Sequence, residues 1–153
     1  MELGQRLKQA NAMLATAESC TGGWAAQAVT SVAGSSEWFE RGFVTYSNAA
    51  KQELLGVRAE TLQRHGAVSE QTAREMAVGA LARSRATIAL AITGVAGPGG
   101  GTADKPVGTV CFAWVRDGAV TAETCRFSGD RQSVRRQSVI YALEGVLEAL
   151  NGG

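Results

Sequence analysis

The sequence predicts an α/β fold: a three-layer α/β/α sandwich around a mixed sheet. Short apolar runs alternate with helical patterns along the chain, which is typical of layered α/β domains. Two consecutive runs in the C-terminal half resemble a β-hairpin, so some pairing in the sheet is antiparallel. The 153 residues, 45% hydrophobic and 19% charged, are typical of one globular domain, and we expect a single domain over 1–153.

The N-terminal half carries short apolar runs separated by turn and cap residues. The run at 13–17 is typical of a buried strand, and the β-branched and aromatic residues at 43–46 favour a second strand. Asn48 is expected to cap a short helix that ends at Gly56. The elements predicted are a helix at 3–11, a strand at 13–17, a helix at 24–29, a strand at 39–46 and a helix at 48–55.

The C-terminal half opens with the clearest helical pattern. Ser69 is a good N-cap, and apolar residues follow at 73, 76, 77, 80 and 81. After it we expect a strand at 87–92, a glycine-rich loop at 93–106, and hairpin strands at 107–115 and 120–127. Asp130 caps the last helix, whose apolar face is Val139, Leu143, Val146, Leu147 and Leu150.

Composition excludes several classes of function. The net charge of +1 gives no reason to expect direct nucleic-acid binding, and no apolar run is long enough to span a membrane. Three widely spaced cysteines and an N-terminus unlike a signal peptide predict a cytoplasmic protein. One histidine and no acidic cluster predict no metal site, and we expect no cofactor.

A polar, glycine-rich turn follows the first predicted strand. Ser19 stands there at the tip of a rigid strand, and the N–H groups of Gly22, Gly23 and the next helix are candidates to hold an oxyanion. This makes Ser19 a candidate nucleophile. The alternative is that Ser19 or Thr21 is an N-cap and the glycines only form the turn. Cys20 is a rival nucleophile that strand alternation turns away from Ser19.

A serine nucleophile needs a base, and the sequence allows either a histidine or a lysine in that role. The only histidine, His65, lies in a predicted surface turn. Lysine serves as a base when burial lowers its pKa, and Lys51 follows Tyr46 at a predicted strand end, at the same sheet edge as Ser19. The alternative is that Lys51 is an exposed lysine on an amphipathic helix.

Two further segments suggest an anionic ligand. The glycine run after Thr93 is not a Walker A loop, because Gly100 occupies the position of the lysine, but its backbone can approach an anion, with Lys105 at its end. Arg131 and Arg135 share a helix face near a helix N-terminus, where cations are disfavoured unless an anion joins them. A flexible lid and a solvated charged face are the alternatives.

Five ordered blocks resemble the CinA C-terminal domain family over essentially the whole chain. They are 17–23, 44–51, 66–70, 93–98 and 105–110. Larger members of that family carry an additional N-terminal domain, so we expect this chain to be the stand-alone form.

The resemblance implies hydrolysis of the carboxamide of nicotinamide mononucleotide to nicotinate mononucleotide and ammonia. It implies Ser19 as nucleophile, Lys51 as base and Tyr46 in support. The phosphate and ribose of the substrate would account for the glycine loop and the arginines. The residues expected to bind substrate are Thr21, Gly22, Gly23, Asn48, Thr93, Gly94, Gly97, Pro98, Gly99, Lys105, Arg131 and Arg135.

Two other functions are compatible with the sequence. One is a non-catalytic nucleotide-binding or interaction module linked to competence or the DNA damage response. The other is an amidase that depends on Cys20. The sequence also leaves the oligomeric state open, a homo-oligomer included.

Overall fold

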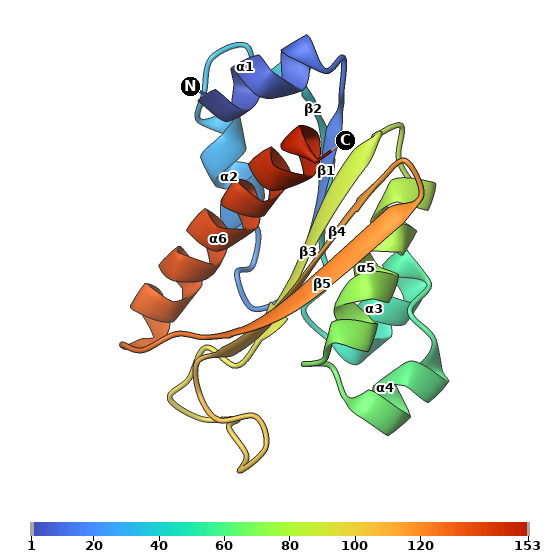
Figure 1. Ribbon diagram of the computed structural model, residues 1–153. Helices are drawn as coiled ribbons and strands as arrows, with labels where there is room; N and C mark the ends of the chain where they lie inside the picture. The colour runs from blue at the N-terminus through green and yellow to red at the C-terminus, as the bar shows by residue number, and fades with distance from the viewer. Residues whose placement is uncertain (1, 153) are drawn as a thin grey trace.

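The computed structural model describes residues 2–152 and is built on one five-stranded sheet, in the order β2-β1-β3-β4-β5 (Figure 1). The strands are β1 (Leu14–Glu18), β2 (Phe39–Val44), β3 (Ile88–Gly94), β4 (Thr109–Arg116) and β5 (Ala119–Arg126). Strand β1 pairs in parallel with β2 and β3, whereas β4 pairs antiparallel with β3 and β5. The predicted mixed sheet and its hairpin are therefore confirmed.

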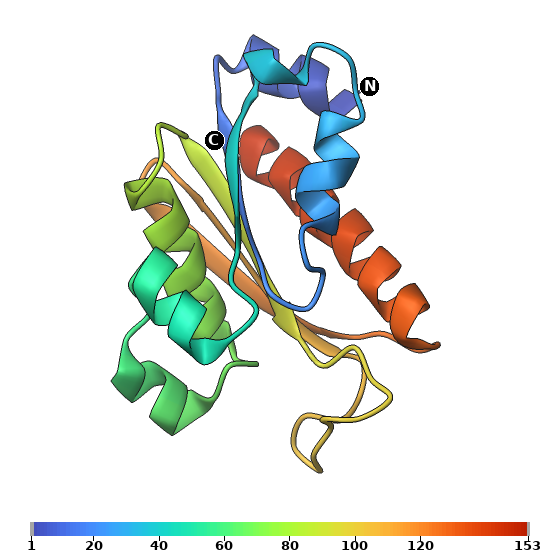
Figure 2. The same ribbon diagram turned by 180° about the vertical axis from the view of Figure 1, so that it is seen from behind.

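Helices cover both faces of the sheet, as Figures 1 and 2 show from opposite sides. One layer holds α1 (Glu2–Gln9), α2 (Trp24–Thr30) and α6 (Arg131–Asn151); the other holds α3 (Asn48–Leu55), α4 (Ala59–His65) and α5 (Glu70–Ala82). A short 3₁₀ turn, η1 (Ser35–Glu37), precedes β2. The three-layer prediction is confirmed. Within residues 2–152, no helix is long and apolar enough to cross a membrane.

The two faces of the sheet are packed with side chains of different size. Toward α6 the strands present leucine, isoleucine, Phe112 and Trp114, and Gly145 of α6 leaves room for the Trp114 indole. Toward α5 they present mainly alanine. A Cβ on Gly79 of α5 would lie 1.9 Å from the carbonyl oxygen of Leu55 in α3. Small residues thus bring α3, the helix that carries Lys51, close to α5 and the sheet.

Helix α4 was not predicted, because its seven residues carry no clear apolar periodicity. Its N-terminal end is stabilised from another helix: the Glu75 carboxylate of α5 accepts hydrogen bonds from the Arg58 amide at 2.9 Å and the Thr61 hydroxyl at 2.6 Å. Tertiary contacts of this kind leave no local trace in the sequence.

The predicted caps are confirmed at two helices and wrong at a third. Ser69 and Asp130 accept hydrogen bonds from backbone amides three residues on, as expected. The cap of α3 is Ser47 rather than Asn48, since the Ser47 hydroxyl accepts the Ala50 amide at 3.0 Å. The second strand ends two residues early, at Val44, so Tyr46 lies just beyond the sheet.

Candidate active site

Ser19 lies where β1 leaves the sheet. Its amide still donates to the Ile92 carbonyl of β3 at 3.0 Å, and its own carbonyl accepts the Gly22 amide at 3.0 Å to close a turn. Gly22 and Gly23 have φ of 60° and 104°, a left-handed region that glycine adopts without strain. The turn therefore departs from a rigid strand end and requires both glycines.

Neither Ser19 nor Thr21 caps α2, so the N-cap alternative is wrong. The buried Glu18 carboxylate accepts the amides of Ala25 at 2.8 Å and Ala26 at 3.0 Å, together with the Thr21 hydroxyl at 2.6 Å. A carboxylate at a helix N-terminus is favourable, and this one fastens the turn to α2. The only sign of this contact in the sequence is a lone acid at the end of an apolar strand, and Glu18 was not predicted as a cap.

These hydrogen bonds also correct the expected oxyanion donors. The Gly22 amide is used by the Ser19 carbonyl, and amides at the start of α2 are used by Glu18. Within the described chain, the amides of Cys20, Thr21 and Gly23 donate to no protein acceptor. Free donors therefore remain in the turn, chiefly in the two residues that follow Ser19.

Lys51 brings its amine to Ser19 from α3. Its Nζ lies 2.9 Å from Ser19 Oγ, 3.0 Å from the Thr45 carbonyl oxygen and 3.3 Å from the Tyr46 carbonyl oxygen. The side chain is only 1% exposed, and none of the ion pairs between described residues includes it. Burial therefore lowers the pKa of Lys51. The alternative of an exposed lysine is wrong.

The Tyr46 side chain points away from this pair. It is 63% exposed, and its hydroxyl accepts a hydrogen bond from Arg131 at 3.2 Å. Arg131 also donates to the Gly97 carbonyl at 2.7 Å, and so it links the end of β2 to the glycine loop. The Tyr46 group that contacts Lys51 is the backbone carbonyl.

A cavity of about 310 Å³ opens beside Ser19 and Lys51. Thr93 holds its wall by donating to the Ala67 carbonyl at 2.8 Å. Predicted residues that line the cavity are Ser19, Tyr46, Asn48, Lys51, Thr93, Gly94, Gly97, Gly99 and Arg131. Cys20, the rival nucleophile, also lines the cavity, whereas sequence reasoning missed Ala67, Val68, Val95, Ala96 and Gly100, which are small or apolar and carry no chemical signal.

Several residues predicted to bind substrate lie elsewhere. The Lys105 amine donates to the His65 carbonyl at 2.5 Å, at the C-terminal end of α4, where helix carbonyls lack partners. Pro98 does not line the cavity. A separate hollow is lined by Thr21, Gly22, Gly23, Trp24, Gln27, Gln132 and Arg135. Lys105 and Arg135 thus bind backbone carbonyls of the protein itself, because both cations have carbonyls within reach that the sequence does not reveal.

Cys20 is not arranged as a nucleophile. Cys20 is as buried as Ser19, but burial raises the pKa of its thiol to about 11, so little thiolate forms at neutral pH. Among residues 2–152, no group of three histidine, cysteine or acidic side chains is placed to hold a metal ion. The chemistry of the cavity therefore centres on Ser19 and Lys51.

The fold and the site define a class: α/β proteins with a serine hydroxyl hydrogen-bonded to a buried lysine amine at the carboxyl edge of the sheet. Comparison with known proteins identifies the particular family. The chain belongs to the CinA C-terminal domain family, whose model matches residues 1–150.

Its relatives include named enzymes. The chain is 58% identical to the nicotinamide-nucleotide amidohydrolase PncC of Escherichia coli K12 over 145 residues, 94% of this chain and 87% of the relative. It is 53% identical to the protein of the same name from Pseudomonas putida, over 95% and 91%. The crystal structure of a competence/damage inducible protein from Agrobacterium tumefaciens matches with a TM-score of 0.92 and 52% identity, over 98% of this chain and 94% of that one.

Proposed function

We propose that this protein hydrolyses the carboxamide of nicotinamide mononucleotide, releasing ammonia and nicotinate mononucleotide. The observation that carries the proposal is the 2.9 Å hydrogen bond between the buried Lys51 amine and the Ser19 hydroxyl. The name nicotinamide-nucleotide amidohydrolase, borne by relatives 53–58% identical to the chain, supports the choice of substrate. We also propose that it acts in the cytoplasm, in keeping with its three free cysteines.

The surroundings of Lys51 support a role as a neutral base. A neutral amine has two N–H donors and one lone pair, and Lys51 has three oxygen neighbours. The Thr45 and Tyr46 carbonyls can only accept, so they take the two N–H groups. The lone pair is then left for the Ser19 hydroxyl, which donates its proton. Burial, which lowers the pKa of Lys51, favours the neutral amine, and in that form the lone pair can accept the Ser19 proton while the two carbonyls hold the N–H groups.

The reaction follows in two stages. Ser19 Oγ attacks the amide carbon while Lys51 takes the hydroxyl proton, and a tetrahedral oxyanion forms. When the C–N bond breaks, Lys51 returns that proton to the leaving nitrogen, so that ammonia departs and an ester with Ser19 remains. Water then attacks the ester, Lys51 takes its proton and passes it to Ser19 Oγ, and the acid is released.

The oxyanion needs donors, and we assign them to the Cys20 and Thr21 amides. Both follow the nucleophile directly and have no acceptor among the described residues. The amide after a nucleophile at a strand-to-helix turn is a recurrent oxyanion donor. Arg131, at the mouth of the cavity, supplies a positive charge for the phosphate of the substrate, and the glycine loop provides backbone contacts for the ribose.

Substitution of the pair tests the proposal. Ser19→Ala and Lys51→Ala should each abolish ammonia release from nicotinamide mononucleotide while circular dichroism shows a folded protein. Ser36→Ala and Lys8→Ala, at exposed positions far from the cavity, are matched controls that should keep the parental rate. Full activity in either Ser19→Ala or Lys51→Ala contradicts the mechanism. A parent protein that releases no ammonia but binds DNA would instead favour the non-catalytic module.

A further inference from the structure

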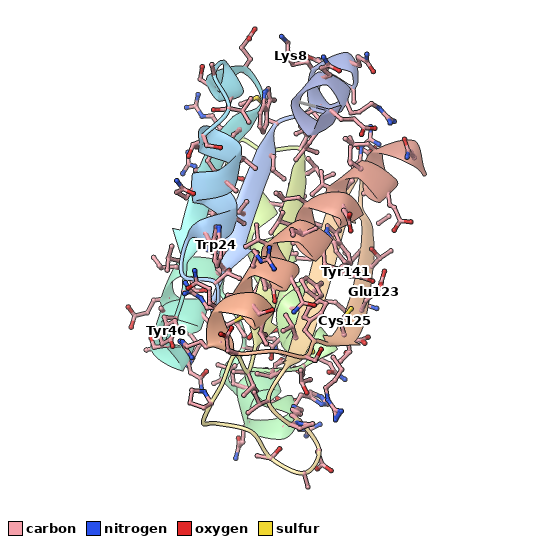
Figure 3. All side chains as sticks on the ribbon, turned by 90° about the vertical axis from the view of Figure 1, so that its left-hand side faces the viewer. Lys8, Trp24, Tyr46, Glu123, Cys125 and Tyr141 are labelled. Carbon is pink, nitrogen blue, oxygen red and sulfur yellow. The ribbon has the colours of Figure 1, made fainter. Side chains whose placement is uncertain are left out.

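Arg135 is the one predicted anion-binding arginine that faces away from the cavity. Its Nε donates to the Cys20 carbonyl at 3.1 Å and its Nη2 to the Thr21 carbonyl at 3.1 Å. Its guanidinium carbon lies 5.5 Å from the centre of the Trp24 ring, at the first residue of α2. Figure 3 shows Trp24 on the same side of the molecule as Tyr46, near α6. Arg135 therefore joins α6 to the turn that carries Ser19.

The contact is specific to an arginine. Two donors in a fixed plane meet two successive carbonyls, and the guanidinium lies over the ring of an indole. A lysine has the same charge but neither the planar fork nor the face for stacking. The contact of Arg135 with the turn therefore depends on the shape of the guanidinium as well as on its charge.

The two carbonyls that Arg135 holds control the orientation of the turn amides. In a trans peptide the C=O and the following N–H point in opposite directions. Holding the Cys20 carbonyl toward α6 therefore turns the Thr21 amide away from α6. The other bonds of the turn run from Gly22 to the Ser19 carbonyl, from Trp24 to the Thr21 carbonyl and from the Thr21 hydroxyl to Glu18, and none of these holds the Cys20 carbonyl. Arg135 restrains it on the side opposite Glu18 and Lys51.

We propose that Arg135, supported by Trp24, is a positioning residue that clamps the turn after Ser19 and holds the hydroxyl and the turn amides in their reactive geometry. The inference rests on the proposed function of Ser19 as nucleophile. It assigns to Arg135 a role different from binding the substrate phosphate, since the side chain does not line the cavity beside Ser19.

The test compares Arg135→Lys and Trp24→Leu with Arg136→Gln. Arg136 is an exposed arginine one residue further along α6, so its variant removes a charge without touching the turn. We expect Arg135→Lys to lower kcat for nicotinamide mononucleotide by about 10- to 100-fold, because small misplacements of reacting groups cost about that much. KM should stay within about twofold. Trp24→Leu should show a smaller loss of kcat, and Arg136→Gln none.

Amide hydrogen exchange provides a readout that does not depend on catalysis. The peptide covering residues 19–24 should exchange faster in Arg135→Lys, with the melting temperature and the rest of the exchange pattern close to those of the parent. An Arg135→Lys protein with raised KM and unchanged kcat overturns the inference in favour of substrate binding, and unchanged exchange at 19–24 overturns it outright. If the parent lacks amidase activity, the proposed function fails, while the exchange data still decide whether Arg135 clamps the turn.

Discussion

Two cations lie on opposite sides of the turn that carries Ser19, and both donate to backbone carbonyls. On the α3 side, the Lys51 amine is 1% exposed and also contacts the Ser19 hydroxyl. On the α6 side, the Arg135 guanidinium is half-buried, bonds two carbonyls after Ser19 and stacks on Trp24. The sequence analysis placed both residues in the active site, Lys51 as a base and Arg135 as a ligand for an anion, whereas Arg135 bonds the turn itself.

The comparison shows how two basic side chains near the same turn come to differ in chemical behaviour. An amine loses its proton when burial makes the charged form costly, so the Lys51 region favours a base. A guanidinium keeps its proton in any protein environment, so Arg135 serves only as a fixed donor of hydrogen bonds. Both side chains lie close to Ser19, so burial and side-chain chemistry, and not proximity, distinguish the proposed base from the proposed clamp.

The largest effect is expected when Lys51 is replaced by a residue that cannot accept a proton. Lys51→Arg keeps the positive charge but cannot accept a proton, and Lys51→Met removes both properties. We expect both to lower kcat by about 10²- to 10⁴-fold, the usual contribution of a general base. Steady-state ammonia release measures this. A Lys51→Arg enzyme that is folded and retains most of its activity would show that charge alone suffices.

A second, pH-dependent effect follows from the lowered pKa of Lys51. The neutral amine is the active form, so kcat/KM should rise about tenfold per pH unit and level off above the Lys51 pKa, at a pH below the 10.5 of an ordinary lysine. Arg135→Lys should leave this inflection in place, since Arg135 bonds the Cys20 and Thr21 carbonyls and not the Lys51 amine.

The same titration should appear in stability. As the pH falls below 10.5, the unfolded chain protonates Lys51 first, and the free energy of unfolding decreases until the folded-state pKa is reached. Lys51→Met lacks this penalty. Its free energy of unfolding, measured by urea denaturation, should exceed that of the parent most at neutral pH, and the excess should shrink toward pH 10.5. A difference that does not vary with pH would contradict a lowered pKa.

The smallest effect concerns Arg131, the neighbour of Arg135 one helical turn away. Arg131 lines the cavity, and loss of its charged hydrogen bonds should weaken binding by more than 1 kcal/mol. We therefore expect Arg131→Gln to raise KM about five- to tenfold with kcat nearly unchanged, the reverse of Arg135→Lys. Initial rates at varied substrate concentration distinguish the two, and a fall in kcat alone for Arg131→Gln would remove the contrast.

Local patterns in the sequence predicted most of the fold, because strands, caps and the hairpin depend on nearby residues. The face of α6 was predicted less well: Val139, Val146 and Leu150 are buried as expected, but Leu143 and Leu147 are only partly so. Helix α4 was missed because it is stabilised from α5 through Glu75.

The candidate site was predicted through residue chemistry and the family resemblance, and less well through geometry. Ser19, Lys51, Thr93 and Arg131 gather around one cavity, where parallel strands end at the same edge of the sheet. Lys105 does not join them, since its amine bonds the end of α4. Charged residue types near a glycine loop indicate an anion site, but they do not show which carbonyl a long side chain will reach.

The sequence by itself determined the layered fold and the turn after β1, because periodicity and glycine positions are local properties, and the family resemblance singled out Ser19 and Lys51 as nucleophile and base. Only the tertiary structure decided that Lys51 is buried against Ser19, that Glu18 caps α2 and that Arg135 faces the turn instead of the cavity. The contacts of Lys51 and Arg135 join segments far apart in the chain, by 32 residues for Lys51 and Ser19 and by 115 for Arg135 and Cys20. Desolvation and hydrogen-bond geometry, which give each cation its role, exist only after those segments have packed together.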